Sequence, residues 1–197
     1  MARDSRRPQS ARAGQLGLKE LRQTEIDKYI KVYAEAPGYG SHGDSLREMI
    51  DTILGSLVGS SLVDLSCGRG AAMEIARRHF ETVQGTEAVP ELLGPDVVFA
   101  LAHKLPFEDN AFDVVLSTGV MEHLLPEDTY PALREMRRVS NRYVVITLNN
   151  KPGYFHINCP SYDAWDDIFT DIFGIVEYLG DMGNGGENRA WLVDGTG

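Results

Sequence analysis

The sequence has few cysteines, no long apolar run and a deficit of positive charge. Its two cysteines, Cys67 and Cys159, lie far apart and indicate no disulfide framework, and no spacing typical of metal ligands occurs. No apolar stretch reaches the roughly 20 residues that span a bilayer. The first residues are polar and rich in arginine, without the apolar segment of a secretory signal. These absences argue against a disulfide scaffold and a membrane protein, and they favour a reducing cytoplasm.

The charge balance is acidic, with 29 Asp and Glu against 19 Lys and Arg and a formal net charge of −10. An acidic surface repels a phosphate backbone, so nucleic acid is disfavoured as a partner. Residues 1–14 are basic instead; we expect a loose tail there, with a nucleic-acid arm as the alternative. The remaining residues, 15–197, have the length of one globular domain, which we expect to be a monomer or a homodimer.

The stretch that organises the chain runs from Ser61 to Gly70. An apolar run, Ser61-Leu62-Val63-Asp64-Leu65, predicts a strand, and a turn of small residues, Ser66-Cys67-Gly68-Arg69-Gly70, follows it. Residues 71–80 then predict a helix. Glycines let the backbone approach a ligand closely, and a helix start presents unpaired N–H groups. We therefore expect a ligand cradle at this turn.

Strand-like and helical segments alternate along the rest of the chain. Apolar strands that alternate with helices predict a parallel sheet covered on both faces, with the ligand beyond the carboxyl ends of the strands. The expected strands are 61–65, 82–87, 97–100, 112–117, 142–148, 175–179 and 189–193. The expected helices are 16–34, a second that begins at Ser41 or Asp44 and ends near 57, then 71–80, 127–139 and 162–173.

Two classes of nucleotide cofactor use a strand, a turn and a helix of this kind. A dinucleotide site requires the pattern G-x-G-x-x-G/A, whose third glycine allows the helix to pack closely on the strand. Here the pattern is Gly68-x-Gly70-x-x-Met73, and Met73 is too bulky for that approach. A dinucleotide is therefore disfavoured.

The order Asp64-x-Ser66-x-Gly68-x-Gly70 resembles the first motif of class I S-adenosylmethionine-dependent methyltransferases, with Ser66 in place of the commoner glycine. Glu87 ends the second expected strand about 17 residues past Gly70, close to the spacing of the ribose-binding acid in such folds. A solvated surface acid is the alternative interpretation of Glu87. The acid and the turn together favour S-adenosylmethionine.

Two later stretches strengthen the resemblance. Residues 105–115, LPFEDNAFDVV, look like the family's LPF-x-D-x-x-FD-x-V stretch, and residues 118–124, TGVMEHL, look like the segment that often ends in Glu-His. The resemblance covers roughly residues 62–148. It implies a three-layer, Rossmann-like α/β sandwich with a seven-stranded, mostly parallel sheet whose last strand is antiparallel. It also suggests that the helices within 15–58 lie over the cofactor site.

The resemblance also assigns roles around the cofactor. The N–H groups of the turn suit the carboxylate of the methionine part, and Glu87 suits the ribose hydroxyls. Residues 101–103 are expected to line the adenine, although many relatives carry Asp at the position of Leu101. The expected cofactor-binding residues are Asp64, Ser66, Cys67, Gly68, Gly70, Glu87, Leu101, Ala102, His103, Ser117 and Thr118.

Methyl transfer is an in-line displacement, in which the enzyme aligns the acceptor and excludes water. A hydroxyl acceptor is helped by a base, and His123 and His156 are the candidates, with a packing role as the alternative for His123. We expect Tyr33, Tyr39 and Asn158 to contact the substrate, with plain helix packing as the alternative for the tyrosines. No metal is expected.

The expected acceptor is a small molecule or a glycan, and a hydroxyl is favoured because histidines flank the presumed site. One alternative is a nucleic-acid or protein methyltransferase that uses the basic tail. The other is a cofactor-binding scaffold without catalysis, for which Leu101 is the hint.

Overall fold

The structure, a computed structural model, describes residues 17–40, 44–153, 155–181 and 188–194. The expected tail, 1–14, lies outside these residues. Seven strands form one sheet: β1 (Ser61–Leu65), β2 (Thr82–Glu87), β3 (Val97–Phe99), β4 (Phe112–Thr118), β5 (Ser140–Asn149), β6 (Val176–Asp181) and β7 (Asn188–Asp194). The helices are α1 (Leu18–Glu35), α2 (Asp44–Ser56), α3 (Ala71–Ala76), α4 (Thr129–Val139) and α5 (Tyr162–Phe173), with short 3-10 turns η1 (Pro90–Leu92), η2 (Met121–His123) and η3 (Pro126–Asp128).

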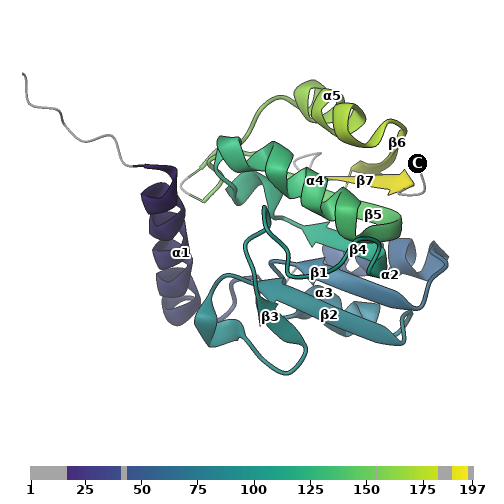
Figure 1. Ribbon diagram of the computed structural model, residues 1–197, viewed down its shortest axis with the longest axis horizontal. Coiled ribbons are helices and arrows are strands. Elements are labelled where there is room, and N and C mark those ends of the chain that lie inside the picture. The colour runs from purple at the N-terminus through teal and green to yellow at the C-terminus, as the bar shows by residue number, and fades with distance from the viewer. Residues whose placement is uncertain (1–16, 41–43, 154, 182–187, 195–197) are drawn as a thin grey trace, which may run out of the picture.

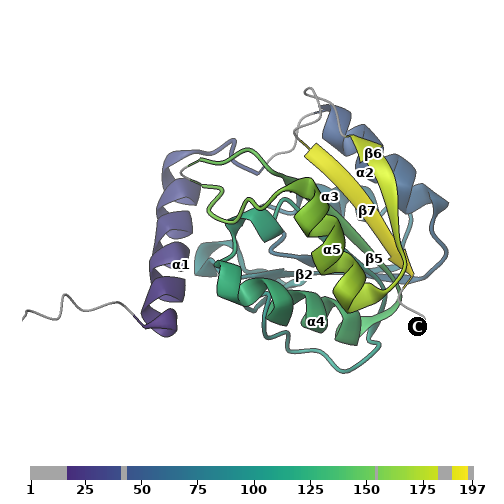
Figure 2. The same ribbon diagram turned by 90° about the horizontal axis from the view of Figure 1, so that it is seen from above.

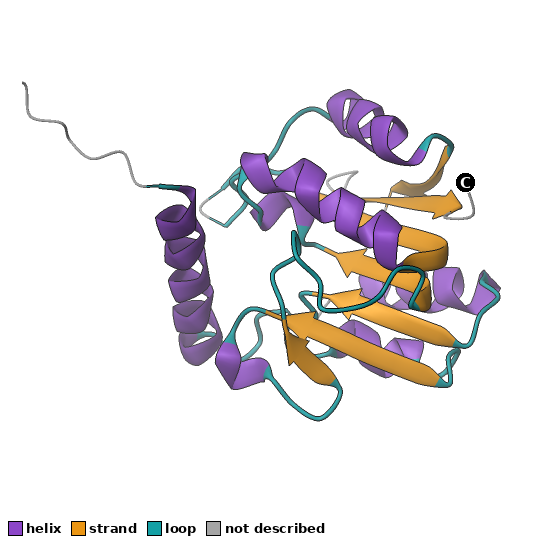
Figure 3. Cartoon of the chain, viewed as in Figure 1, coloured by secondary structure: helices purple, strands orange, loops and turns teal. Residues whose placement is uncertain are grey.

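The strand order is β3-β2-β1-β4-β5-β7-β6. β1 pairs in parallel with both β2 and β4, and β7 pairs antiparallel with β5 and β6. Figures 1 and 3 show that the helices cover both faces of this sheet. The expected three-layer sandwich with an antiparallel last strand is confirmed. The chain order reverses on either side of β1, which places the ligand crevice at the carboxyl end of that strand.

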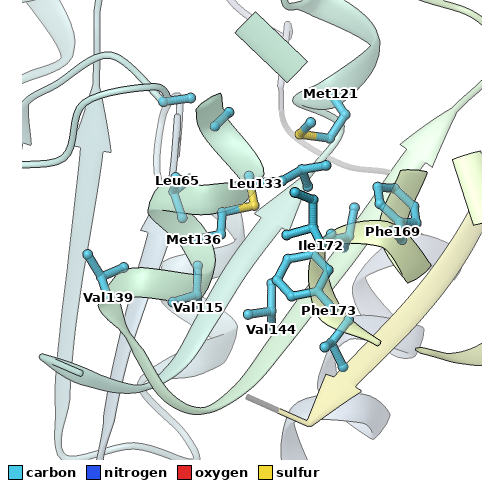
Figure 4. Close-up of a cluster of buried hydrophobic side chains, with 14 of the residues drawn as sticks. Leu65, Val115, Met121, Leu133, Met136, Val139, Val144, Phe169, Ile172 and Phe173 are labelled. Carbon is cyan, nitrogen blue, oxygen red and sulfur yellow. The ribbon is translucent and has the colours of Figure 1, made fainter. Parts of the chain in front are cut away.

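Two apolar cores lie on opposite faces of the sheet. One joins α2 and α3 to β1, and the other joins α4 and α5 to β4, β5 and β7. Figure 4 shows the second, in which Leu133 and Met136 of α4 meet Phe169 and Ile172 of α5. Because β1 is covered on both faces, Leu62 through Leu65 are all buried, which explains its nearly continuous apolar run.

The 105–115 stretch is held by two charged side chains. The Asp113 carboxylate accepts from the backbone N–H of Ser60 at 2.7 Å, and so ties the start of β4 to the start of β1. The pKa of Asp113 is lowered to about 2 by hydrogen bonds from the backbone and side chains of Ser60 and Ser61 and from the side chain of Asn141. Arg138 of α4 donates to the carbonyl of Phe107 at 2.7 Å and so anchors the preceding loop. Asp113 of the motif therefore joins β4 to β1, and Arg138 fixes the loop before β4 on α4.

Most element boundaries agree with the sequence expectation, and one differs clearly. The expected helix 71–80 ends at Ala76, where the N–H groups of Arg78 and His79 bond to the carbonyls three residues back. This tighter turn ends the α-helix early. Pro131 is the third residue of α4 and lies in its first turn, where a missing N–H costs no hydrogen bond.

Helix α1 stands across the carboxyl ends of the parallel strands, at the side of the sheet (Figures 1 and 2). None of its residues is fully buried. Arg22 fixes it, because its Nε donates to both carboxylate oxygens of buried Asp128 at 2.9 and 3.1 Å. Within the described ranges, no helix is both long and apolar enough to cross a bilayer.

The aromatic part of the second core gives a stability test. Phe169 is 0% exposed and lies between the rings of Trp165 (5.4 Å) and Trp191 (5.2 Å). Phe169→Ala leaves a cavity, so we expect the free energy of unfolding to fall by about 3–5 kcal/mol. The matched control is Phe99→Ala on the sheet edge, where the side chain is 53% exposed. Denaturant unfolding measures the free energy of unfolding of both variants. An equal loss in Phe169→Ala and Phe99→Ala would contradict the assignment of Phe169 to the core.

Candidate cofactor and acceptor site

A cavity of about 520 Å³ opens at the carboxyl ends of the parallel strands and is roofed by α1. Its wall is formed by five segments: the turn after β1, the end of β2, the segment after β3, and the residues after β4 and β5. The sheet topology brings these segments together, although they are far apart in sequence. The cavity therefore occupies the crevice that the strand order predicts.

The turn after β1 has left-handed backbone at every second residue. Ser66, Gly68 and Gly70 have φ of +50°, +54° and +79°. This alternation accounts for the spacing of the motif, because glycine tolerates such angles and Ser66 adopts one at a cost. A Cβ at Gly68 would also lie 2.5 Å from the hydroxyl oxygen of Tyr33. Gly68 therefore allows α1 to come close to the turn.

The backbone amides of the turn are engaged within the protein. The N–H of Cys67 donates to the carbonyl of Thr86, and that of Gly70 donates to the carbonyl of Cys67, both at 2.9 Å. The N–H of Gly68 donates to Oε2 of Glu87, also at 2.9 Å. The helix that follows is only six residues long. In this structure the turn thus shapes the wall, and the expected carboxylate donors at Gly68 and Gly70 are already bonded.

Glu87 is held at the cavity wall by three backbone donors. Besides the bond from Gly68, its Oε1 accepts from the N–H of Ala88 at 2.7 Å and of Val89 at 3.1 Å. The residue is 5% exposed, yet it lines the cavity. The alternative of a solvated surface acid is therefore wrong. Three donors fix the carboxylate in one orientation, with acceptor capacity left for a ligand.

Asp64 lies behind the turn and does not line the cavity. It is 0% exposed, and neither carboxylate oxygen has a hydrogen-bond partner among the described residues. Burial, and secondarily the nearby charge of Glu87, raises the pKa of Asp64 to about 8. An uncompensated buried carboxyl of this kind is neutral around pH 7.

Residues 101–103 form another part of the wall. A bridge between Leu101 and Lys104 closes this short turn, and Leu101, Ala102 and His103 all line the cavity. The Nδ1 of His103 lies 3.7 Å from Oδ2 of Asp128, and burial lowers the pKa of His103. The segment offers an apolar surface with one polar side chain.

Glu122, His123 and His156 gather in another part of the cavity wall. Oε1 of Glu122 accepts from the N–H of Asn149 at 2.9 Å, and burial raises the pKa of Glu122 to about 7. Burial also lowers the pKa of His123 to about 4, so its imidazole is neutral at pH 7. The rings of His123 and His156 face each other edge-on, with centroids 4.8 Å apart.

Aromatic rings from α1 and the following turn close this part of the cavity. Tyr39 packs edge-on against Tyr33, with centroids 5.3 Å apart, and lies 5.8 Å from Phe155 beyond β5. The hydroxyl of Tyr29 lies 2.7 Å from Nδ1 of His123. Tyr33 and Tyr39 thus line the cavity and also pack against each other.

The structure separates the expected residues into those that reach the cavity and those behind its wall. The lining residues are Tyr33, Tyr39, Ser66, Cys67, Glu87, Leu101, Ala102, His103, Thr118, His123 and His156. Those that do not line it are Asp64, Gly68, Gly70, Ser117 and Asn158. The amide of Asn158 is buried and donates to the carbonyl of Met121 and to Oγ1 of Thr129. Asn158 therefore holds its loop in place.

Several lining residues were missed from the sequence, among them Arg22, Tyr29, Glu122 and Asp128. Glu122 carried a signal, because it precedes His123 directly after an expected strand. Tyr29 lies four residues before Tyr33 on the same helix face. The Arg22–Asp128 pair joins residues 106 positions apart, and no local pattern indicates it.

Comparison with known proteins gives a family match over the central part of this fold. Residues 63–144, from β1 into β5, match the model of the family described as "Methyltransferase domain". A methyltransferase domain therefore occupies residues 63–144, and together with the fold it supports a class I S-adenosylmethionine-dependent methyltransferase. The cavity of this methyltransferase fits the cofactor S-adenosylmethionine, because a fixed carboxylate at Glu87 stands beside an apolar wall of adequate size. Comparison with curated protein sequences gives no match.

Solved structures share the fold at low sequence identity. The Burkholderia thailandensis 1,6-didemethyltoxoflavin-N1-methyltransferase, with S-adenosylhomocysteine bound, has TM-score 0.72 and 13% identity over 92% of each chain. A chain in the Haloferax volcanii complex of the Trm112 methyltransferase activator with a methyltransferase has TM-score 0.69 and 14% identity, over 88% of this chain and 97% of that one. The Synechocystis magnesium protoporphyrin IX methyltransferase has TM-score 0.65 and 14% identity, over 86% and 96%.

The buried carboxyl of Asp64 predicts a pH dependence. Its pKa of about 8 in the fold exceeds the unfolded value of about 3.9, so its stabilising contribution is complete below about pH 4 and is lost as the pH rises through 8. Asp64→Asn removes this titration. From pH 5 to 8 we expect the stability of the variant, relative to wild type, to rise by on the order of 1 kcal/mol per pH unit. Exposed Asp171→Asn is the control, and parallel pH profiles for all three proteins would contradict the expectation.

Proposed function

We propose that this methyltransferase transfers a methyl group to a hydroxyl of a small molecule or a glycan. The supporting observation is the cavity itself, which α1 roofs and in which Glu122, His123 and His156 stand together as polar groups. Two of the structural neighbours are named for small acceptors, a toxoflavin precursor and magnesium protoporphyrin IX. The net charge of −10 disfavours a nucleic-acid acceptor.

The cofactor end is formed by Glu87 and residues 101–103. The carboxylate of Glu87 accepts hydrogen bonds from the ribose hydroxyls, while residues 101–103 cover the adenine. Leu101 offers no polar side chain, so adenine is recognised there by backbone groups and by apolar contact. Ser66, Cys67 and Thr118 complete the wall around the methionine part. When bound, S-adenosylmethionine supplies a methyl group made electrophilic by its sulfonium.

The chain orients the acceptor and excludes water. The tyrosines of α1 and its following turn close the cavity above the acceptor end, and the Arg22–Asp128 pair holds α1 in place. Removing water strengthens the electrostatic interactions inside the site and fixes the acceptor near the reacting carbon. The neutral imidazole of His123, with the ring of His156 beside it, accepts a hydrogen bond from an acceptor hydroxyl and holds it in line.

Glu87→Gln tests the cofactor end. The amide lacks one acceptor oxygen and the charge, so we expect affinity for S-adenosylhomocysteine to fall by on the order of 1–3 kcal/mol, measured by calorimetry on the folded protein. Glu91→Gln in the exposed turn η1 is the matched control and should bind as wild type does. Unchanged affinity in Glu87→Gln would contradict the ribose role.

A labelled methyl donor tests the acceptor class. We expect the full chain to label hydroxylated small molecules or glycans, and to leave mixed RNA, duplex DNA and protein extracts unlabelled. Labelling that is confined to nucleic acid or protein, and that is lost when residues 1–14 are deleted, would instead favour the tail-dependent alternative. Tight cofactor binding with no labelling of any class would favour a scaffold without catalysis.

A further inference from the structure

Three potential metal ligands converge at the acceptor end of the cavity. Glu122, His123 and His156 each offer one ligand atom, and these three atoms all lie within 4.8 Å of one another. His156 is 33 positions from His123 in sequence, so sequence spacing does not indicate the group. The carbonyl of Glu122 accepts from the N–H groups of Ile157 and Asn158 at 2.9 and 3.1 Å, which holds the His156 loop against η2.

The hydrogen bonds of both histidines fix the same tautomer. Nδ1 of His123 is 2.8 Å from the carbonyl oxygen of Phe155, and Nδ1 of His156 is 2.8 Å from that of Lys151. A carbonyl oxygen only accepts, so Nδ1 of His156 carries the proton and its lone pair is on Nε2. The bond to Phe155 gives His123 the same tautomer, in which the Tyr29 hydroxyl, 2.7 Å from Nδ1, accepts rather than donates. Histidines that bind metals usually donate their other ring N–H to a backbone carbonyl or carboxylate in this way.

The carboxylate completes the donor set. Oε1 of Glu122 accepts from the backbone of Asn149, whereas buried Oε2 has no hydrogen-bond partner among the described residues. A buried oxygen without a donor is costly, and a cation would satisfy it. Glu122 is 1% exposed, so a solvated acidic cluster does not explain its position.

We propose that Glu122, His123 and His156 form a binding site for one divalent transition-metal ion of the zinc type. Two histidines and one carboxylate are a common ligand set of zinc sites that keep an open coordination position. Donors that share one zinc at about 2.0–2.1 Å lie closer together than 4.8 Å, so small side-chain rotations close the set on binding. The open position faces the cavity, where an oxygen of the acceptor would occupy it.

This proposal rests on the proposed function in one respect: the ligand at the open coordination position would be the methyl acceptor. Metal binding and cofactor binding can be measured separately, because Glu87 and the Glu122 group are different residues of the same cavity. A chain that binds the cofactor and no metal contradicts the metal site alone, and a chain that binds metal and no cofactor contradicts the proposed function alone.

Titration with Co²⁺ tests the site without relying on turnover. The full chain, treated with chelator and then freed of it, should bind one Co²⁺ per chain and show the visible absorption bands of a low-symmetry site with nitrogen ligands. Zn²⁺ should displace Co²⁺ and abolish the bands. A chain that binds no Co²⁺, or that shows only the weak spectrum of the hydrated ion, would overturn the proposal.

Substitutions identify the ligands. His156→Gln and Glu122→Gln should each weaken Co²⁺ binding by at least about tenfold and alter the bands. His103→Gln is the matched control, because His103 lines the same cavity outside the group and its loss should leave Co²⁺ binding unchanged. Thermal unfolding establishes that each variant is folded, and S-adenosylhomocysteine binding confirms it for the variants of Glu122 and His156. Unchanged Co²⁺ affinity in folded His156→Gln would refute the site, even if Glu122→Gln fails to fold.

Discussion

The hydrogen bond from the Gly68 N–H to Glu87 joins the turn after β1 to the end of β2, and the cavity depends on it. Parallel pairing places these two strand ends side by side, but it does not fix the conformation of the turn between β1 and α3. The bond does so by holding the left-handed turn against a carboxylate that two further amides orient. An acid at this position therefore holds the turn in place, in addition to the ribose role that we propose for it.

The order of strands and helices could be predicted from the sequence, because apolar strand runs and the three- to four-residue spacing of a helix face are both local patterns. β1 is apolar throughout since it is covered on both faces, and Pro131 falls in the first turn of α4, where it is tolerated. The early end of α3 at Ala76 could not be predicted, because residues 77–80 keep a helical composition while their amides form a tighter turn. Local patterns indicate which element forms and leave its last turn to tertiary contacts.

Site residues at or just after strand ends could be predicted from the sequence. Those that reach the site through contacts between distant segments could not. Glu87 ends β2 and His123 lies in the turn after β4, so the topology alone places them at the crevice. Two of the predicted residues only support the wall: Asp64, named by the motif, is buried behind it, and Asn158, predicted to contact the substrate, holds a loop. The ion pair of Arg22 with Asp128 and the approach of His156 to His123 arise only when separate segments meet.

Burial gives the two ends of the cavity different electrostatic properties. At Glu87, three backbone donors compensate for the lost water, and the carboxylate is fixed as an acceptor for hydroxyl groups. At Glu122, one oxygen keeps a backbone donor and the other has none among the described residues. The same residue type, at the end of β2 and in the turn η2 after β4, thus has its acceptor oxygens engaged at one place and one of them left without a donor at the other, and this difference is the basis of the two ligand roles that we propose.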